Sequence, residues 1–180
     1  MSKTAELAKF IADGTLGTDV TNIKHSGGTN ALTIDSTGRV LTPARPSFKA
    51  KPSSNGTLAG TNVIVLDNVT STTHGCHNVG GHYSTSTGKF TAPLSGVYVF
   101  MVSLYTNDAT DCEINFVKTA SGTEQDCGVA RIFADGKSYD TLNWCGNVYM
   151  NANETAHFKV HSGTAYYNAN VSSTSGYLLG

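Results

Sequence analysis

The chain has 180 residues, enough for one domain of ordinary size with a short appendage. Only 14% of the residues are charged, and the formal net charge of -1 argues against a nucleic-acid-binding protein or one that binds anionic membranes. No apolar run approaches the roughly 20 residues that cross a bilayer, so membrane insertion is excluded as well. Short apolar runs separated by Gly, Asn, Ser and Thr indicate an all-β fold.

The N-terminal pattern predicts a short helix over residues 4–13, with Gly14 as its stop. A helix of this length is not stable alone in water, so it needs a surface to dock on. Its large apolar groups are the candidate anchors of that docking: Leu7, Phe10 and Ile11.

A small hairpin is predicted next, in the phrase "TNALTIDSTGRVLTP". Leu32 and Ile34 alternate with Thr33, residues 35–38 supply a turn that ends in glycine, and Val40 resumes the alternation. This phrase, with the opening "AELAKFIADGTL", resembles the N-terminal segments of tail-fibre-like virion proteins of bacteriophages. The resemblance implies an attachment arm over residues 1–45. The alternative is an ordinary N-terminal arm without that role.

Residues 46–180 are predicted to form a compact sandwich, because many short apolar runs alternate with breaks of good turn composition. Eight to ten short strands without a long helix are typical of a double-sheet jelly roll. The candidate strands are residues 45–50, 63–69, 88–92, 97–105, 112–118, 128–134, 141–150, 155–160 and 177–179.

A family resemblance supports this fold. Asn78, Tyr83 and Phe90 precede the run "GVYVFMV" that starts at Gly96, and the words "GKFTAPLSGVYVF" and the C-terminal "STSGYLL" carry most of the likeness. The pattern resembles the globular head of complement component 1q, a jelly-roll family related to tumour necrosis factor. The resemblance implies a trimeric binding or structural module and only rarely an enzyme.

Three positions depart from the family pattern. Thr72 stands where the pattern has Phe, Val102 stands where an aromatic is usual, and the turn at residues 153–154 is Asn-Glu in place of Gly-Asp. No acidic cluster matches a calcium site, so none is carried over from the family.

The run at residues 97–105 is apolar on both faces, whereas a strand with one face in water should be polar there. One face is expected to fill the core, with Tyr98, Phe100, Val102 and Leu104. The other is expected to pack on a neighbouring subunit, or alternatively beneath loops of its own chain. The candidate trimer-interface residues on that second face are Val97, Val99, Met101 and Tyr105.

Four residues, His74, Cys76, His77 and His82, are chemically suited to zinc, but their spacing matches no standard motif. We therefore assign no metal and no cofactor. The sequence contains no Gly-x-Ser-x-Gly elbow, and no pair of carboxylates stands out. The prediction is that the protein is not an enzyme and has no catalytic residues.

The aromatic residues Trp144, Tyr166 and Tyr167 are candidates for a glycan-stacking surface, with core or interface packing as the alternative.

The cysteines are expected to be free thiols, because the N-terminus has no apolar leader and folding in a cytosol follows. This expectation applies at least to Cys76 and Cys145. Cys112 and Cys127 flank a predicted hairpin, so a disulfide between them is allowed if strand pairing brings them opposite each other.

Together these features predict a homotrimeric bacteriophage virion structural protein, either a capsid decoration protein, a head fibre or a tail-fibre-like appendage. Residues 1–45 would bind another virion protein, and residues 46–180 would form the head, with a host-surface glycan or protein as a further candidate partner. The chain would fold in the host cytoplasm and reside in the virion. The alternative is a glycan- or protein-binding recognition module of the complement or adhesin type.

Overall fold

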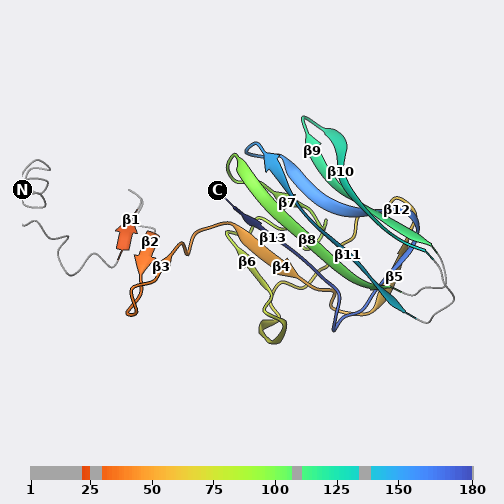
Figure 1. Cartoon of the computed structure of the whole chain (residues 1–180), viewed down its shortest axis with the longest axis horizontal. Helices are drawn as coiled ribbons and strands as arrows, with labels where there is room; N and C mark the ends of the chain where they lie inside the picture. Colours follow the sequence, from red (N-terminus) through yellow and green to blue (C-terminus); the bar gives the residue numbers. More distant parts are fainter. Residues whose placement is uncertain (1–21, 25–29, 107–110, 134–138, 180) are drawn as a thin grey trace, which may run out of the picture. The chain divides into compact units, whose positions relative to one another are not determined.

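The computed structural model describes residues 22–24, 30–106, 111–133 and 139–179. The chain divides into two compact units, residues 1–45 and 46–180. The described part of the first is a small antiparallel sheet, and the second is a head built from two sheets (Figure 1). The expected helix at residues 4–13, with its candidate anchors Leu7, Phe10 and Ile11, lies outside the described residues.

The predicted hairpin of the first unit is confirmed, and a third strand that was not predicted pairs with it. The three strands are β1 (Asn22–Lys24), β2 (Asn30–Ile34) and β3 (Val40–Leu41). The Asp35 carboxylate holds the turn, because it accepts hydrogen bonds from the backbone N–H groups of Thr37 (2.9 Å) and Arg39 (3.0 Å). The Thr37 hydroxyl and the Arg39 side chain add further bonds to it, which together lower the pKa of Asp35 to about 2.

The head consists of two five-stranded sheets that face each other (Figure 1). One sheet has the order β11-β8-β13-β4-β6, from β11 (Asp140–Met150), β8 (Gly96–Thr106), β13 (Ser173–Leu178), β4 (Ser47–Ala50) and β6 (His77–Val79). The other has the order β10-β9-β12-β5, from β10 (Thr123–Ile132), β9 (Cys112–Ala120), β12 (Thr155–Tyr167) and β5 (Gly56–Ala59), and β7 (Phe90–Thr91) pairs with β12. The all-β sandwich predicted from the sequence is confirmed.

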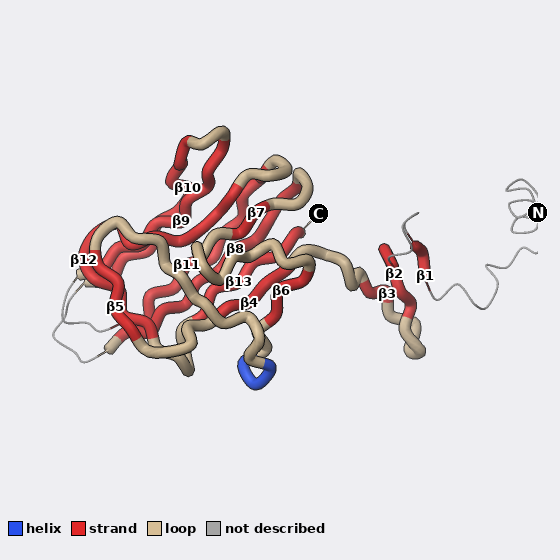
Figure 2. The backbone as a smooth tube through the Cα atoms, turned by 180° about the vertical axis from the view of Figure 1, so that it is seen from behind, coloured by secondary structure: helices blue, strands red, loops and turns tan. Residues whose placement is uncertain are grey.

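The predicted strand at residues 63–69 is wrong. This apolar segment makes only isolated bridges, such as Val63 to Lys159, and runs as an extended loop between β5 and the short helix η1 (Thr72–His74) (Figure 2). A backbone hydrogen bond and a side-chain anchor take the place of strand pairing here. Ile64 N–H donates to the Phe158 carbonyl (2.8 Å), and Leu66 is held through both of its backbone groups by the Tyr83 hydroxyl. Both Ile64 and Leu66 are buried, so the apolar residues of this segment indicate packing in the core and not a strand.

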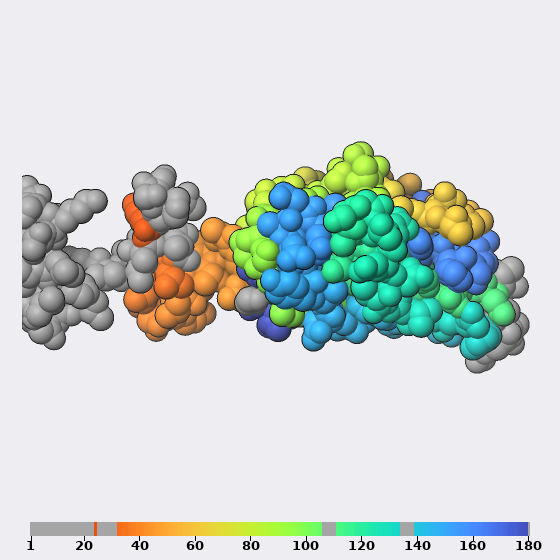
Figure 3. Space-filling view, turned by 90° about the horizontal axis from the view of Figure 1, so that it is seen from above, coloured from red at the N-terminus to blue at the C-terminus, as the bar shows by residue number. Residues whose placement is uncertain are grey.

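Two other boundaries differ from expectation. The "HSG" sequence at residues 161–163 was predicted to end a strand, but β12 continues through it with a bulge between Val160 and Ser162. Likewise, β9 and β10 extend to a tight turn at Ser121 and Gly122, where a longer break was predicted. In the space-filling view the teal residues of this hairpin lie against blue residues of β11 and β12 (Figure 3).

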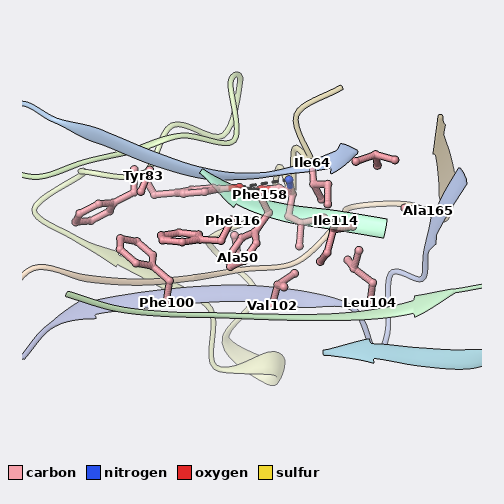
Figure 4. Close-up of a cluster of buried hydrophobic side chains, with 14 of the residues drawn as sticks. Ala50, Ile64, Tyr83, Phe100, Val102, Leu104, Ile114, Phe116, Phe158 and Ala165 are labelled. Carbon is pink, nitrogen blue, oxygen red and sulfur yellow. Dashed lines mark hydrogen bonds between the residues drawn. The ribbon is translucent and has the colours of Figure 1, made fainter. Parts of the chain in front are cut away.

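The core between the sheets is rich in aromatic rings. Phe100 from β8 faces Phe116 from β9 with 5.0 Å between ring centroids (Figure 4). Phe48 stacks on Tyr83 with 4.4 Å between ring centroids. Val102, one of the positions that depart from the family pattern, is buried in the same layer. Burying each such side chain contributes about 1.5–3 kcal/mol before the conformational entropy is subtracted.

Trp144 closes the gap between the edge strands of the two sheets. Its indole ring, on β11, stacks on Phe116 at 4.7 Å and reaches across to β10. A Cβ at Gly128 or Gly146 would overlap this ring, so both positions need glycine. Of the two alternatives for Trp144, a glycan-stacking surface or core packing, the structure has core packing, because the ring lies at the edge of the core.

The spacing between Asn78 and Tyr83 has a direct structural reason. The Asn78 amide donates to the Tyr83 carbonyl (2.8 Å) and accepts from the Tyr83 N–H (3.1 Å), which closes the turn after β6. This clamp aims the Tyr83 ring into the core, where its hydroxyl donates to the Leu66 carbonyl (3.0 Å) and accepts from the Leu66 N–H (3.3 Å). Residues far apart in the sequence are thus joined at one buried point.

Candidate functional site

Strand β8 has the two-faced character that the sequence predicted. Tyr98, Phe100, Val102 and Leu104 point into the core and are at most 3% exposed. The alternate residues Val97, Val99, Met101 and Tyr105 point to the outer face of the β11-β8-β13-β4-β6 sheet and are half-buried. The structure therefore assigns the four interface candidates to a single outer surface of the head.

The strand register arranges this outer face in rows, since residues on paired strands lie side by side about 4.8 Å apart. One row contains, in strand order, Asn147, Val99, Tyr177, Ser47 and Val79. The next contains Cys145, Met101, Ser175, Lys49 and His77. A third contains Asn143, Ser103 and Ser173.

One end of the face is apolar and the other is hollow and polar. At the apolar end Val97 and Val99 lie beside Tyr149, which is 56% exposed, and Tyr177. Toward the other end a depression of about 450 Å³ opens over Ser103, Ser173 and their neighbours. The outward positions of the described strands in this sheet contain no carboxylate, so the face as a whole is weakly charged.

Tyr105 differs from the other three interface candidates. It lies at the far end of β8, and its ring stacks on Tyr139 of the same chain, with centroids 5.0 Å apart and planes 15° apart. Tyr166 approaches Tyr139 at 6.1 Å, so one of the three proposed glycan-stacking aromatics does join an aromatic cluster. Tyr167 does not join it among the contacts of the described residues, because its ring lies over Gly56.

The outer face of the opposite sheet is charged, which distinguishes it from the β8 face. Glu124 pairs with Lys159 at 2.8 Å and lies 3.5 Å from the His157 ring. Glu113 on the neighbouring strand pairs with Arg131. A face of paired charges is typical of a surface in water, because these pairs keep their solvation there.

His157 is the most perturbed group on this charged face. Its side chain is fully covered, and burial, followed by the nearby Lys89 charge, lowers its pKa to about 4. Neither ring nitrogen has a hydrogen-bond partner within the described part of the chain. The ring is therefore neutral at physiological pH, and no local pattern in the sequence indicates this buried histidine.

The histidine and cysteine residues that were weighed for zinc do not converge. His74 bonds to the Ser71 hydroxyl through Nδ1 (2.9 Å), His77 Nδ1 donates to the Gly75 carbonyl (3.1 Å), and His82 packs on the edge of Phe90. Across residues 22–24, 30–106, 111–133 and 139–179, no three His, Cys, Asp or Glu side chains are grouped as metal ligands.

The four cysteines are free in the structure, as expected for Cys76 and Cys145. The condition for a disulfide between Cys112 and Cys127 is not met, because the β9–β10 register pairs Cys112 with Ile132 and leaves Cys127 in a bulge several residues away. Cys127 and Cys145 are exposed, on β10 and on the β8 face. Within the described residues no helix is long and apolar enough to span a membrane.

Known proteins give a consistent picture of the head. The model of the C1q domain family matches residues 48–179. Similar solved structures include the globular domain of zebrafish complement 1qA protein, with a TM-score of 0.60 and 11% identity over 76% of this chain and 98% of that chain. Others are Eiger TNF from S. frugiperda (TM-score 0.58, 10% identity, 76% and 94% covered) and murine APRIL at pH 5.0 (0.56, 8%, 75% and 99%).

A search of curated proteins found no match to this sequence. The structural likenesses, at 8–11% identity, show the fold, and the family model covers nearly the whole head. With its two five-stranded sheets and the matched residues 48–179, the chain belongs to the C1q domain family.

Proposed function

We propose that the protein is a homotrimeric, non-enzymatic binding and structural module that associates through the outer face of the β11-β8-β13-β4-β6 sheet. The observation that carries this proposal is the contrast between the two outer faces of the sandwich. The β8 face presents Val97, Val99 and Met101 without a carboxylate, whereas the opposite face carries paired charges. Only the first face can be buried against copies of itself without removing many charges from water.

The energy available from this face is sufficient for association. Burying a few hundred Å² of apolar surface on each subunit contributes several kcal/mol, at about 25 cal/mol per Å². Interfaces of specific complexes bury about 800 Å² per partner, so such an interface would include most of the five strands. Membership of the C1q domain family supports the same mode of assembly.

The finer part of the proposal is a place on a bacteriophage virion, as a capsid decoration protein, head fibre or tail-fibre-like appendage. It is supported by the resemblance of the N-terminal segment to tail-fibre-like proteins and by exposed apolar side chains in the described arm. Ile34, Val40 and Leu41 are 43%, 64% and 44% exposed, so their apolar side chains are available to a partner. The arm would bind another virion protein, and the head would be available to a host-surface glycan or protein.

A recognition module that is not part of a virion is the second candidate. It is favoured by the aromatic cluster of Tyr105, Tyr139 and Tyr166, which lies at the opposite end of β8 from the chain's entry into the head. Exposed aromatic rings of this kind stack on sugar rings or fill protein interfaces. Electron microscopy of particles that contain the chain distinguishes the two candidates.

The assembly is tested by placing a charge on each outer face in turn. We expect Val99→Asp to convert the full-length protein from a trimer to a monomer, measured by light scattering at micromolar concentration. Val129 is 58% exposed on the charged face of β10, so Val129→Asp is the matched control and should leave the trimer intact. A wild-type monomer, or equal masses for the two variants, would contradict the proposed interface.

A further inference from the structure

We propose that the depression on the β8 face binds a small oxyanion of the phosphate or sulfate class, with the Lys49 ammonium as its charged partner. The site deepens the proposed function, because it lies on the surface through which the trimer would form. The trimer can form without the ion, and the ion can bind without the trimer.

The hollow arises from small side chains on adjacent strands. Ser103 on β8 pairs directly with Ser173 on β13, and Ser175 lies two residues further along the same outer side. Taller neighbours surround them, including Met101 beside Ser175 and Lys49 on the next strand. Three short side chains among longer ones leave the depression of about 450 Å³, within the range of ligand sites.

The groups that line the hollow are suited to an anion. Lys49 contributes an ammonium, Asn143 an amide N–H₂, and Ser103, Ser173 and Ser175 contribute hydroxyl groups. No carboxylate lines the depression, and the Lys49 side chain forms no ion pair or hydrogen bond within the described part of the chain. These donors and the cation share the depression with the apolar side chain of Met101, and they favour a ligand that carries negative charge and several acceptor oxygens.

A second depression extends the basic character of the site. It has a volume of about 240 Å³ and shares Lys49 and Ser173 with the first. Lys51 and His74 also line it, and again no carboxylate does. Lys49 and Ser173 thus line both depressions. The charged side chains around the two depressions are all basic.

Formation of the trimer would make the ion more necessary. The outward residues of the described strands of this sheet include no Asp or Glu, so where copies of this face meet around a three-fold axis the face brings no carboxylate to Lys49. An ammonium that is buried without a partner is strongly destabilising. A bound oxyanion supplies the missing charge and accepts hydrogen bonds from the surrounding hydroxyl groups.

The test measures thermal unfolding of the full-length protein against inorganic phosphate, with sodium chloride adjusted to hold the ionic strength constant. Phosphate raises the stability of many proteins by exclusion from their surface, and this effect grows steadily with concentration. Binding at a site instead gives a rise that follows ln(1 + [L]/Kd) from low millimolar concentration. We expect the wild type to gain at least about 3 °C in Tm by the binding term.

Lys49→Met should lose the rise in Tm that comes from phosphate binding and keep only the gradual rise that comes from exclusion of phosphate from the surface. Lys89→Met, which removes a lysine outside both depressions, should behave as the wild type. Light scattering on the same samples separates this proposal from the trimer. A monomer with phosphate binding that depends on Lys49 supports the site and contradicts the trimer. Two results would overturn the oxyanion site. One is a trimer whose Tm rises only gradually with phosphate concentration. The other is the same dependence of Tm on phosphate for the wild type and Lys49→Met.

Discussion

Replacing Tyr83 with Phe removes one oxygen atom and should be unusually costly. The hydroxyl makes two hydrogen bonds, to the carbonyl and the N–H of Leu66, in a region where Tyr83 is 4% exposed and Leu66 is fully buried. Without it both backbone groups are left without a partner, since residues 63–69 form no strand there. Each buried, unsatisfied group costs about 1–3 kcal/mol, so the loss of two partners in Tyr83→Phe should reduce the free energy of unfolding by about 2–6 kcal/mol.

Tyr98→Phe is the matched control for this variant. The Tyr98 hydroxyl makes a single bond, to the carbonyl of Leu94 (2.8 Å), and Leu94 is 44% exposed, so the loss of this bond should cost only about 0.5–1.5 kcal/mol. Denaturant unfolding of both variants, followed by circular dichroism, gives the two values. Equal losses of stability for the two variants would refute the account of the Leu66 anchor.

The same hydroxyl makes stability depend on alkaline pH. Burial raises the pKa of Tyr83 to about 12, above the value of about 10 for an exposed tyrosine. Its contribution to stability is therefore complete below pH 10 and is lost as the pH rises toward 12. Tyr83→Phe should unfold with a weaker dependence on pH in this window than the wild type.

Three further predictions concern other parts of the molecule. Gly128→Ala should destabilise the head by about 1–3 kcal/mol, because the new Cβ meets the Trp144 ring; in thermal unfolding a Tm equal to that of the wild type would be the contrary result. His157 has its pKa lowered from 6.5 to about 4, so stability should be complete above pH 6.5 and fall as the pH drops toward 4. His157→Gln should weaken this acid dependence, as measured by urea unfolding at each pH, although Lys89, Lys159, Glu124 and Asp126 also surround the ring. Removal of residues 1–40 should leave a folded head with the same number of subunits per assembly as the full-length protein. A particle-binding assay should then show that attachment is lost. Full attachment would mean that the head itself is the anchor.

The strands that the sequence predicted well are those with regular alternation. The run at residues 97–105 lies within β8 and the run at 141–150 within β11, because period-two patterns over such lengths fit only a strand between a core and an outer face. The turn after Ile34 was equally predictable, since Asp35 and Gly38 supply its hydrogen bonds and its positive φ of 83°.

Other features depend on contacts that no local pattern contains. Residues 63–69 have the composition of a strand, yet partners remote in the sequence, Tyr83 and Phe158, hold them as a loop. The short strands β5 and β6 carry too few apolar residues to be recognised. The two-faced character of β8 was predictable from alternation alone, whereas the hollow beside Lys49 was not, because it requires the register of four strands.

The two exposed cysteines offer the most direct test of the proposed burial of the β8 face between subunits. Cys145 lies on that face beside Met101, while Cys127 lies on β10 outside it, and both are exposed in a single chain. We predict that iodoacetamide alkylates Cys127 of the native protein rapidly and Cys145 at least ten times more slowly, as followed by mass spectrometry, and that Val99→Asp restores rapid modification of Cys145. Rapid modification of both thiols in the native wild type at micromolar concentration would contradict burial of this face between subunits.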